Sequence, residues 1–449
     1  MNATSSSVRL GAMDLYHPLP CPNGWTTRRL RFVTQINKAQ PIALSPEDEV
    51  SFVPMAAIGE HGGIQLDQVK ALDEIGDGYT YFADGDVVVA KITPCFENGK
   101  GAFAESLKNG IAFGTTELHV IRPAQDIDGR FLFYLTISEL FRKLGEGAMY
   151  GAGGQKRVPD QFIKDFQALV PPLDQQQKIA AFLDRKTAEI DTLIAKKRRL
   201  LDRLAEKRTA LITHAVTKGL NPDAPMKDSG IEWLGEIPAH WEVMPVRRLA
   251  KSVKNAIKVG PFGNQLVLSE MLDGEQDVLV FNQRSVLDKD FSNKKYTISE
   301  EKFLELAAFE VFPRDLLIST RGTIGRCAVA PDSIQKGVLH PCLMRIRLDE
   351  SYVLPEFLEF LVEDSPIAIE QLRLASNSTT IDVIYSNTLK AVKVPIPPTE
   401  EQEQVISAIK QYNTEIDQIS EKVKLAITAL EEYRSALITN AVTGQIKVA

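Results

Sequence analysis

The chain has 449 residues, of which 44% are hydrophobic and 25% charged, a composition that excludes a disordered or fibrous protein. This length is enough for two or three domains, each with a core of its own. The formal net charge of −7 argues mildly against a protein that holds nucleic acid alone by bulk electrostatics, and it leaves local basic surfaces open.

The sequence predicts neither a membrane protein nor a secreted one. No apolar run approaches the roughly 18–20 residues that span a bilayer, and the serine-rich N-terminus lacks the basic-then-apolar pattern of a secretory signal. Four cysteines, Cys21, Cys95, Cys327 and Cys342, occur without CxxC or Cys/His spacing. We therefore expect a cytoplasmic protein with buried free thiols and no metal site.

The first part of the chain, 25–168, has the pattern of an α+β domain. It opens with a basic cluster at 28–31, and a strand-like apolar run follows Asp86. An alternating stretch at 117–121 and an amphipathic helix around 129–144 complete the pattern.

A long helix is predicted over 174–217. It follows Pro171-Pro172, and prolines stop an earlier element but are tolerated in the first turn of a helix. Asp174 lies in that first turn, where the helix dipole favours negative charge, and no glycine or proline interrupts the residues that follow. At 1.5 Å per residue, a continuous helix of this kind would be roughly 60–65 Å long.

A turn-rich linker, 219–240, leads into a second mixed segment, 241–393. This segment has the basic pair Arg247-Arg248 near its start, a strand-like run after Asp315 and a helix around 355–374. The two segments therefore read as two α+β domains that are alike in plan and different in sequence.

A second long helix, 400–442, repeats the first with a period of 226 residues and no gap. Pro397-Pro398 corresponds to Pro171-Pro172, and both helices end in Ala-Leu-Ile-Thr-x-Ala-Val-Thr. A single repeat of this length indicates a duplicated domain-plus-helix unit rather than a solenoid. The internal pseudo-two-fold repeat suits a target with two parts.

Apolar residues recur in both helices at a spacing near 3.5, which predicts that the helices pack on each other as an antiparallel coiled coil. The predicted seam consists of Ile190, Leu193, Leu201, Leu204 and Leu211 with Ile416, Ile419, Val423, Ile427, Leu430 and Leu437. In the alternative arrangement, each helix packs only on its own globular domain. Arg208 and Arg434, at matched places in the two stripes, are expected to snorkel or to form ion pairs.

This layout resembles the specificity subunit of type I restriction-modification systems, and the resemblance covers essentially the whole chain. Its most specific elements are the paired helices, each with Pro-Pro and then Gln at the start and Leu-Ile-Thr-x-Ala-Val-Thr at the end, and the passage 226–241. The segments 85–95 and 321–325 look like two variants of the core of a target recognition domain.

The first helix departs from the family pattern at one place. It carries Asp174-Gln175-Gln176 where the family usually has Glu-Gln, as in Glu401-Gln402 of the second helix. This departure bears on local contacts at the start of the helix and leaves the assignment unchanged.

The resemblance implies two target recognition domains, 1–168 and, with the linker, 220–393, and two spacer helices, 169–219 and 394–449. Each domain would read one half of a split DNA site, which should be asymmetric because the domains differ in sequence. The implied partners are double-stranded DNA, two methyltransferase subunits docked on the helices, and restriction-translocase subunits, with no membrane. S-adenosylmethionine, ATP and Mg²⁺ would be bound only by those partner subunits.

Polar and basic side chains on loops and strand ends are the candidates for reading base edges or holding phosphates. In the first domain they are Arg28, Arg29, Lys91, Asn98, Lys100, Gln155, Lys156 and Arg157. In the second domain they are Arg247, Thr320, Arg321, Thr323, Asn377 and Thr379. For each of them, an ordinary solvated surface position is the alternative.

Enzymatic functions find little support in the sequence. It has no Asn/Asp-Pro-Pro-aromatic motif for amino methylation and no glycine-rich cofactor loop after a first strand. His119 and His340 fall in predicted strands, where packing is expected, and neither Asp86 nor Asp315 precedes the Glu-x-Lys of a nuclease. We expect a non-catalytic recognition subunit of a restriction-modification complex. The alternatives are a subunit of a modification-only methyltransferase complex, a stand-alone nuclease and a coiled-coil scaffold.

Overall fold

The computed structural model describes residues 20–38, 43–152, 154–232, 234–271, 278–321, 325–376 and 383–448, with the side chains of Asn264 and 373–376 left out. The chain divides into two compact units. Unit 1 comprises 1–198 and 424–449, and unit 2 comprises 199–423. Each unit therefore contains one α+β domain and a part of both long helices.

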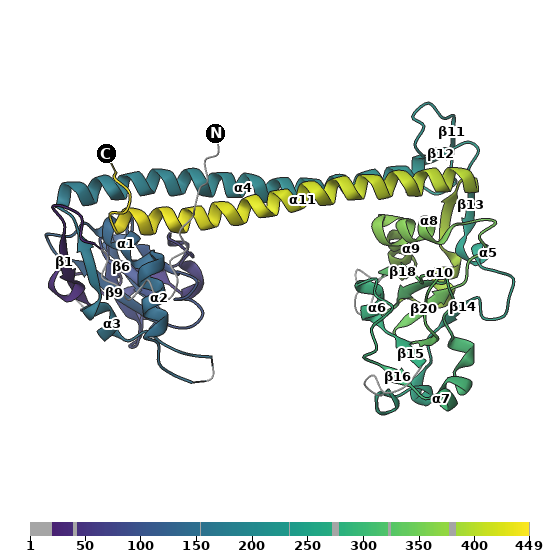
Figure 1. The fold of residues 1–449 in the computed structure, drawn as a ribbon, viewed down its shortest axis with the longest axis horizontal. Coiled ribbons are helices and arrows are strands. Elements are labelled where there is room, and N and C mark those ends of the chain that lie inside the picture. The colour runs from purple at the N-terminus through teal and green to yellow at the C-terminus, as the bar shows by residue number, and fades with distance from the viewer. Residues whose placement is uncertain are drawn as a thin grey trace. The chain divides into compact units, whose positions relative to one another are not determined.

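Short strands form the framework of the unit 1 domain (Figure 1). They are β1 (Thr26–Arg29), β2 (Thr34–Ile36), β3 (Glu49–Val53), β4 (Val69–Ala71), β5 (Thr80–Ala83), β6 (Val87–Ala90), β7 (Gly101–Phe103), β8 (Ile111–Gly114), β9 (Leu118–Pro123) and β10 (Gln167–Val170). One sheet has the order β2-β9-β6-β7 and is antiparallel throughout. The other has the order β4-β3-β8-β5, in which β3 and β8 run parallel, and β1 pairs with β10 as a separate antiparallel ribbon.

The helix expected around 129–144 is broken in two. It forms α1 (Gly129–Ile137) and α2 (Glu139–Gly147), because Ser138 between them has extended backbone angles and caps α2 by accepting a hydrogen bond from the Phe141 N–H. Asp128 caps α1 in the same way. A short helix, α3 (Asp160–Asp165), leads into β10.

Unit 2 repeats this framework. Its strands are β11 (Met226–Asp228), β12 (Glu236–Pro238), β13 (Glu242–Pro245), β14 (Ile257–Val259), β15 (Val278–Phe281), β16 (Thr297–Ile298), β17 (Leu316–Ser319), β18 (Cys327–Val329), β19 (Gly337–Leu339), β20 (Leu343–Ile346) and β21 (Lys393–Ile396). The sheet β14-β20-β17-β18 matches β2-β9-β6-β7, and β16-β15-β19 matches β4-β3-β8, again with its last pair parallel. The ribbon β13–β21 matches β1–β10. The linker, expected to be turn-rich, also contains the hairpin β11–β12.

The helices of unit 2 are α5 (Val246–Leu249), α6 (Gln283–Leu287), α7 (Glu300–Glu305), α8 (Pro355–Glu359), α9 (Pro366–Ser376) and α10 (Ser386–Ala391). A π-helical turn, Phe360–Asp364, continues α8. The helix expected around 355–374 is thus interrupted before Pro366, at Ser365, which has extended backbone angles. The equivalent helix of the first domain is interrupted at Ser138 in the same way.

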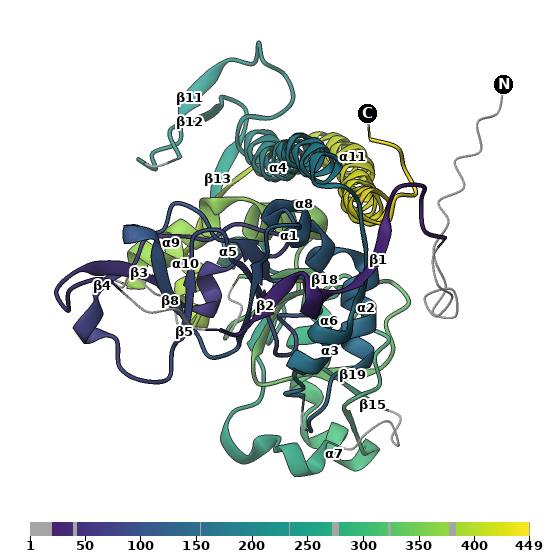
Figure 2. The same ribbon diagram turned by 90° about the vertical axis from the view of Figure 1, so that its left-hand side faces the viewer.

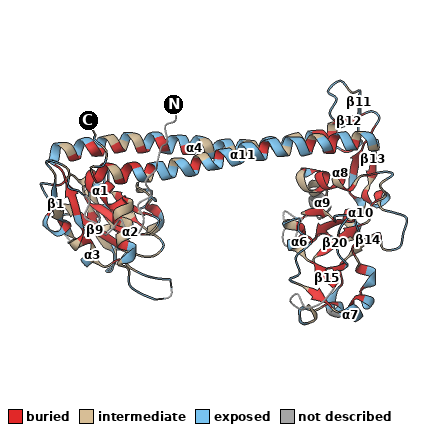
Figure 3. Cartoon of the chain, viewed as in Figure 1, coloured by how far each residue is buried: buried red, intermediate tan, exposed pale blue. Residues whose placement is uncertain are grey.

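The central strands β6 and β17 are buried along their whole length, which agrees with their continuous apolar sequences. Figure 3 shows buried residues in the interior of both α+β domains. Each is preceded by a buried aspartate. Asp86 accepts the Ala83 N–H and pairs with Arg122 of β9 at 2.6 Å, and Asp315 pairs with Arg347 at 3.0 Å. Asp315 also accepts the N–H three residues before it. Both aspartates therefore fix a turn and tie neighbouring strands together.

The two long helices are α4 (Leu173–Lys218) and α11 (Thr399–Val442), which lie side by side in Figures 1 and 2. In unit 1, Arg434 of α11 pairs with Asp191 of α4 at 3.1 Å. In unit 2, Arg208 of α4 pairs with Asp417 of α11. These pairs are the same contact with the helices exchanged, since 208 and 434, like 191 and 417, differ by 226. The helices run antiparallel, as the coiled-coil prediction requires.

The burial of the predicted seam is uneven. Ile190, Ile416, Val423, Ile427 and Leu437 are buried, and Leu201, Leu204, Leu211 and Leu430 are half-buried. Leu193 and Ile419, however, are 46% and 45% exposed, so the structure does not bring these two equivalent residues into the seam. The neighbouring Ile194, only 7% exposed, is buried in place of Leu193.

A fully buried glutamine attaches each long helix to its domain. The side-chain oxygen of Gln176, in the first turns of α4, accepts the Asp128 N–H at 2.7 Å. Its amide nitrogen donates to the carbonyls of Asp126 at 3.1 Å and Pro171 at 2.8 Å. The side chain therefore uses both ends of its amide, as a buried polar group must.

Gln402 makes the same three bonds in unit 2. It accepts the Leu354 N–H at 2.8 Å and donates to the carbonyls of Tyr352 at 2.8 Å and Pro397 at 2.9 Å. Every partner lies 226 residues beyond its counterpart in unit 1. The repeat thus extends from the sequence to individual hydrogen bonds.

Two further observations concern the expected environment of the chain. Within the described residues, no helix combines the length and apolar character needed to cross a bilayer. All four cysteines are free, but only Cys327 is buried. Cys21 is exposed and the other two are half-buried, so the expectation of buried thiols holds for one of the four.

Replacing Gln402 with alanine should lower the free energy of unfolding by about 1–3 kcal/mol, because the Leu354 N–H and two carbonyls lose a buried partner. Denaturant unfolding of the purified chain measures this change. The exposed neighbour Glu403→Ala is the matched control and should stay within about 0.5 kcal/mol of wild type. Equal stabilities of the two variants would contradict the structural role of Gln402.

Candidate nucleic-acid interface

In unit 1, two loop segments are hydrogen bonded to each other beyond the end of β6. The Thr93 N–H donates to the Lys156 carbonyl at 2.9 Å, and the Val158 N–H donates to the Lys91 carbonyl at 2.8 Å. An isolated bridge joins Ile92 to Arg157. Three of the predicted DNA-contact residues, Lys91, Lys156 and Arg157, are thereby brought together at one edge of the domain.

The charges on this edge are partly engaged already. Arg157 forms a bidentate ion pair with Glu117, with distances of 2.8 and 2.9 Å, and this pairing lowers the pKa of Glu117 below its ordinary value. Gln155 and Lys156 are exposed on the loop. Gln155 and Lys156 therefore present the more available polar groups, while Arg157 is held in place by its carboxylate.

Asn98 and Lys100 flank Gly99 in the turn before β7. The Asn98 amide donates to the Glu60 carboxylate at 3.0 Å, and the Lys100 ammonium donates to the Met55 carbonyl at 3.3 Å. Asn98 is exposed and Lys100 half-buried. Both side chains are thus at the surface and partly committed to the turn 55–61.

Arg28 and Arg29 belong to the ribbon β1–β10. They lie 3.6 Å from Asp126 and 3.5 Å from Asp165, respectively, and their side chains remain 41% and 50% exposed. Ion pairs between exposed side chains contribute little and exchange readily with other partners. The structure places these two arginines on a different element from Lys91 and Arg157.

The equivalent edge of unit 2 has different side chains on the same backbone bridge. Arg321 forms the isolated bridge with Val383, and the Ile384 N–H donates to the Thr320 carbonyl at 2.9 Å. Arg321 follows Asp315 by six residues, as Ile92 follows Asp86. In unit 2 the arginine of the bridge, Arg321, therefore belongs to the first of the two bridged segments. In unit 1 the arginine, Arg157, belongs to the second.

Arg321 is exposed and lies over an exposed aromatic ring. Its guanidinium carbon is 5.8 Å from the ring centre of Phe262, which is 59% exposed. A guanidinium stacked on an aromatic ring offers donors in a fixed plane together with a flat apolar face, a combination used in nucleic-acid contacts. This pair is the best formed candidate reading element in unit 2.

The structure differs from the prediction at Thr320. This residue is 2% exposed, and its hydroxyl donates to the Cys342 carbonyl at 2.9 Å, so its side chain is committed to the core and cannot reach DNA. The reason is its place directly after the buried strand β17. Arg247, in α5, is exposed as expected. Thr323, Asn377 and Thr379 lie outside the described residues.

Two exposed aromatic residues were absent from the predicted set. Phe262 and Tyr150, which is 65% exposed, both lie beside predicted basic residues. Phe262 stands in Gly-Pro-Phe-Gly and Tyr150 precedes a glycine, and an aromatic residue in such a turn is poorly placed for a core. That context is the signal that could have found them.

The groups considered for catalysis have structural partners. His119 is 3% exposed, its Nε2 lies 2.8 Å from the Val158 carbonyl oxygen, and burial lowers its pKa. Burial also lowers the pKa of His340. Asp86 and Asp315 are held by Arg122 and Arg347, as described above. In the described part of the chain, no group of three His, Cys, Asp or Glu side chains is arranged to hold a metal ion.

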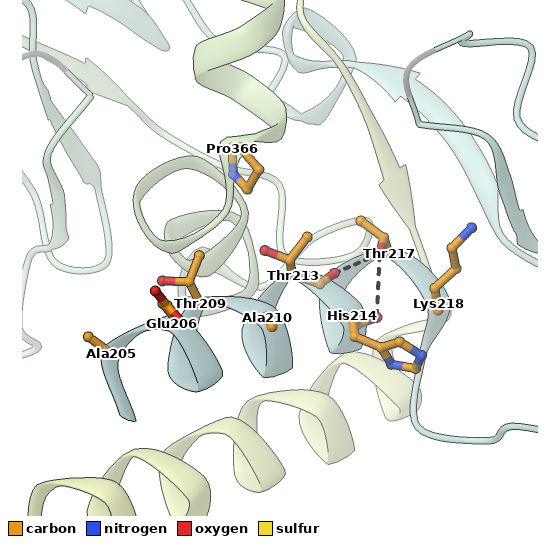
Figure 4. A pocket seen from close by; sticks show the side chains of 9 residues that line it. All are labelled: Ala205, Glu206, Thr209, Ala210, Thr213, His214, Thr217, Lys218 and Pro366. Carbon is orange, nitrogen blue, oxygen red and sulfur yellow. Dashed lines mark hydrogen bonds between the residues drawn. The ribbon is translucent and has the colours of Figure 1, made fainter. Parts of the chain in front are cut away.

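A cavity of about 770 Å³ lies in unit 2 against the last turns of α4 (Figure 4). It is lined by Ala205, Glu206, Thr209, Ala210, Thr213, His214, Thr217, Lys218 and Pro366. The Thr217 hydroxyl donates to the Thr213 carbonyl at 2.6 Å, whereas the Thr213 hydroxyl is buried without a partner. The mixture of small residues with a few polar groups does not assemble a catalytic centre.

Unit 1 explains why the Thr213 hydroxyl lacks a partner. There the equivalent Thr439 hydroxyl accepts the Glu139 N–H, at the start of α2, at 3.0 Å. Pro366 begins α9 where Glu139 begins α2, and proline has no N–H to donate. The cavity therefore marks a place where the two units have diverged.

Comparison with known proteins agrees with the repeated architecture. Two solved structures share the fold over most of their length. One is from work on complex assembly and conformational transition of the type I R-M system, with a TM-score of 0.73 and 18% identity over 96% of this chain and 100% of that chain. The other is the HsdS subunit from Thermoanaerobacter tengcongensis, with a TM-score of 0.56 and 19% identity over 96% and 99%.

The relatives found by sequence are proteins of the same kind as those found by structure. The specificity subunit of the type I restriction enzyme EcoAI from Escherichia coli is 43% identical over 164 residues, or 36% of this chain and 28% of that protein. The matched stretches span only 28% of this curated relative and 27% of a second one, the EcoEI specificity subunit from Escherichia coli. A putative type I specificity subunit, MjaX, from Methanocaldococcus jannaschii is 22% identical over 95% of both chains.

The model of one protein family matches well over half of the chain. It covers residues 22–202 and 281–429, which include both α+β domains in large part and most of both long helices. The chain belongs to the family described as the type I restriction modification DNA specificity domain.

Proposed function

We propose that this chain is the non-catalytic DNA-recognition subunit of a type I restriction-modification complex. In this proposal the domains 1–168 and 220–393 each read one half of a split, asymmetric site in double-stranded DNA. The helical segments 169–219 and 394–449 set the distance between the halves and dock two methyltransferase subunits. Restriction-translocase subunits complete the nuclease, and those partners bind S-adenosylmethionine, ATP and Mg²⁺.

One observation carries this proposal. The two domains share a framework down to equivalent hydrogen bonds, yet they differ in the side chains at the equivalent edge. Ile92 and Arg157 form the bridge in one domain, and Arg321 and Val383 form it in the other. A repeated frame with different surface chemistry is what recognition of two different half-sites requires.

The first experiment is a methylome of a host that expresses this chain with the methyltransferase encoded beside it. We expect a new split, asymmetric motif to be methylated, and the methylome to give the sequences of both halves of the motif together. A host that expresses the methyltransferase alone is the control. An unchanged methylation pattern, in cells where the two subunits copurify, would contradict DNA recognition by this chain.

Arg321→Ala should relax sequence preference in one half of the motif only, because Arg321 belongs to unit 2. Loss of a well-placed base contact costs about 1–3 kcal/mol of discrimination. Methylation rates on duplexes substituted at each motif position measure the change. Arg284→Ala, an exposed arginine paired with Asp288 in the same unit, should leave the preference unchanged. Relaxation in both halves would contradict separate reading.

Lengthening both helices together should lengthen the gap between the half-sites. Seven residues inserted after Arg199 and seven after Leu425, positions 226 apart, add about 10.5 Å, the rise of about three base pairs. Three base pairs also turn one half-site by about 100° around the DNA axis, so binding should weaken.

The methylated motif of the lengthened variant gives the answer. We expect the original spacing to be lost and the remaining methylation to fall on the same half-sites about three base pairs further apart. An unchanged gap would show that the helices do not act as the spacer.

A further inference from the structure

A cluster of basic side chains lies in unit 1 where α2, the turn 59–63 and α11 meet. Arg434 of α11 donates from Nη2 to the His61 carbonyl at 3.2 Å. A Cβ atom placed on Gly99 would lie 2.5 Å from Nη1 of Arg142 and 3.2 Å from Nδ1 of His61. The Arg142 guanidinium and the His61 ring therefore meet over Gly99.

Arg142 has no acceptor among the described residues. Its Nε is buried without a hydrogen-bond partner, and its guanidinium takes part in no ion pair within that part of the chain. Burial lowers its pKa from the ordinary arginine value, although the carboxylates of Glu139 and Glu146 act in the opposite direction. Only Nε is buried and the residue as a whole is half-buried, so an outside anion would meet the terminal nitrogens of this unpaired guanidinium.

The nearby carboxylates are engaged elsewhere or remain at a distance. Glu139 pairs with Lys143, and Glu60 accepts from the Asn98 amide. Asp191 pairs with Arg434 and is itself 53% exposed. Glu146 is exposed and forms no ion pair with Arg142 within the described residues. The cluster thus keeps an uncompensated cation.

The positive charge of this cluster at neutral pH comes from its two arginines, and His61 adds none. Burial, followed by the charges of Arg434 and Arg142, lowers the pKa of His61 to about 4. The imidazole is therefore neutral and can donate one hydrogen bond without adding charge.

Unit 2 shows that the fold does not need an arginine at this place. Gly325 is the counterpart of Gly99, with φ of +78° against +74°. The side chain over Gly325 is that of Ile369, from the helix that corresponds to α2. The same scaffold therefore accepts an aliphatic residue, which points to a function rather than a structural demand for Arg142.

We propose that Arg142, positioned beside Arg434 and His61, holds one backbone phosphate of the DNA at the unit 1 domain. The inference rests on the proposed function. A guanidinium matches the phosphate oxygens with two parallel N–H donors. The missing side chain of Gly99 makes room for the Arg142 guanidinium at this place. Asn98 and Lys100 on either side of Gly99 supply further donors at the surface.

The surroundings favour phosphate over a carboxylate of a partner protein. Asn98 at the rim is polar and exposed, whereas the core of a protein interface is apolar. If the site binds a phosphate, this also explains why unit 2 can lack the site. Phosphate contacts position the protein and carry no sequence information, so two half-sites need not share them.

The test compares Arg142→Ile, the residue that unit 2 uses, with Arg142→Lys and with the control Lys143→Ala. The assembled complex with the methyltransferase is titrated with a duplex carrying its motif and with an unrelated duplex, at several salt concentrations. We expect Arg142→Ile to weaken binding of both duplexes about tenfold and to reduce the salt dependence by about one counterion. Arg142→Lys should retain most of the affinity, and the methylated motif should be the same for all variants.

Several outcomes would overturn the inference. The inference would be overturned if Arg142→Ile bound DNA with the affinity and salt dependence of the wild type. An altered methylation motif would also overturn it, because that would indicate base reading. Poor copurification of Arg142→Ile with the methyltransferase, with normal DNA affinity of the complexes that form, would assign the site to a protein carboxylate instead. A wild-type complex without preference for its motif would overturn the proposed function, and the inference with it.

Discussion

The buried glutamine at the start of each long helix is the contact on which the rest of each unit depends. Gln176 and Gln402 satisfy one N–H and two carbonyls of their own domains with a single side chain. If the helix rotated or slipped by one residue, the amide and its partners would be buried without hydrogen bonds. The glutamine therefore fixes the helix in one register against the domain, so that the length of the helix becomes a defined distance.

The indole of a tryptophan reinforces each of these attachments. Trp25 donates to Gln175 at 2.9 Å, and Trp241 donates to Glu401 at 3.0 Å. The departure from the family pattern at Gln175 is thus harmless, because an amide oxygen accepts the indole N–H as a carboxylate oxygen does. The contact tolerates the substitution because it needs an acceptor and does not need a charge.

The long helices could be predicted from the sequence, but the details of their packing could not. An uninterrupted run repeated 226 residues later leaves little alternative to two equivalent helices. The choice between the adjacent apolar residues Leu193 and Ile194 depends on the crossing of the helices, which a spacing near 3.5 does not specify. The breaks at Ser138 and Ser365 escaped prediction because the apolar pattern continues through a serine that either caps a helix or lies inside one.

The candidate interface was predictable only in part, for reasons that individual residues illustrate. Arg321 is exposed as expected, but Thr320 beside it is buried, and the sequence alone does not give the position at which β17 leaves the core. Arg142 escaped notice because an arginine in an amphipathic helix ordinarily lies on the solvated face. Its lack of an acceptor is a property of three segments that meet only in the folded chain.

The distribution of charge within unit 1 limits how strongly the chain can hold DNA by itself. Arg28, Arg29 and Arg157 all lie beside carboxylates of their own domain, and the whole chain carries a net charge of −7. A DNA phosphate that binds at such an arginine must compete with a tethered carboxylate, which reduces the gain from each contact. Low affinity of the free subunit is compatible with high selectivity, because base contacts discriminate while phosphate contacts hold. Under the proposed function, the paired arginines therefore favour a subunit that binds its site firmly only when partner subunits supply the missing positive charge.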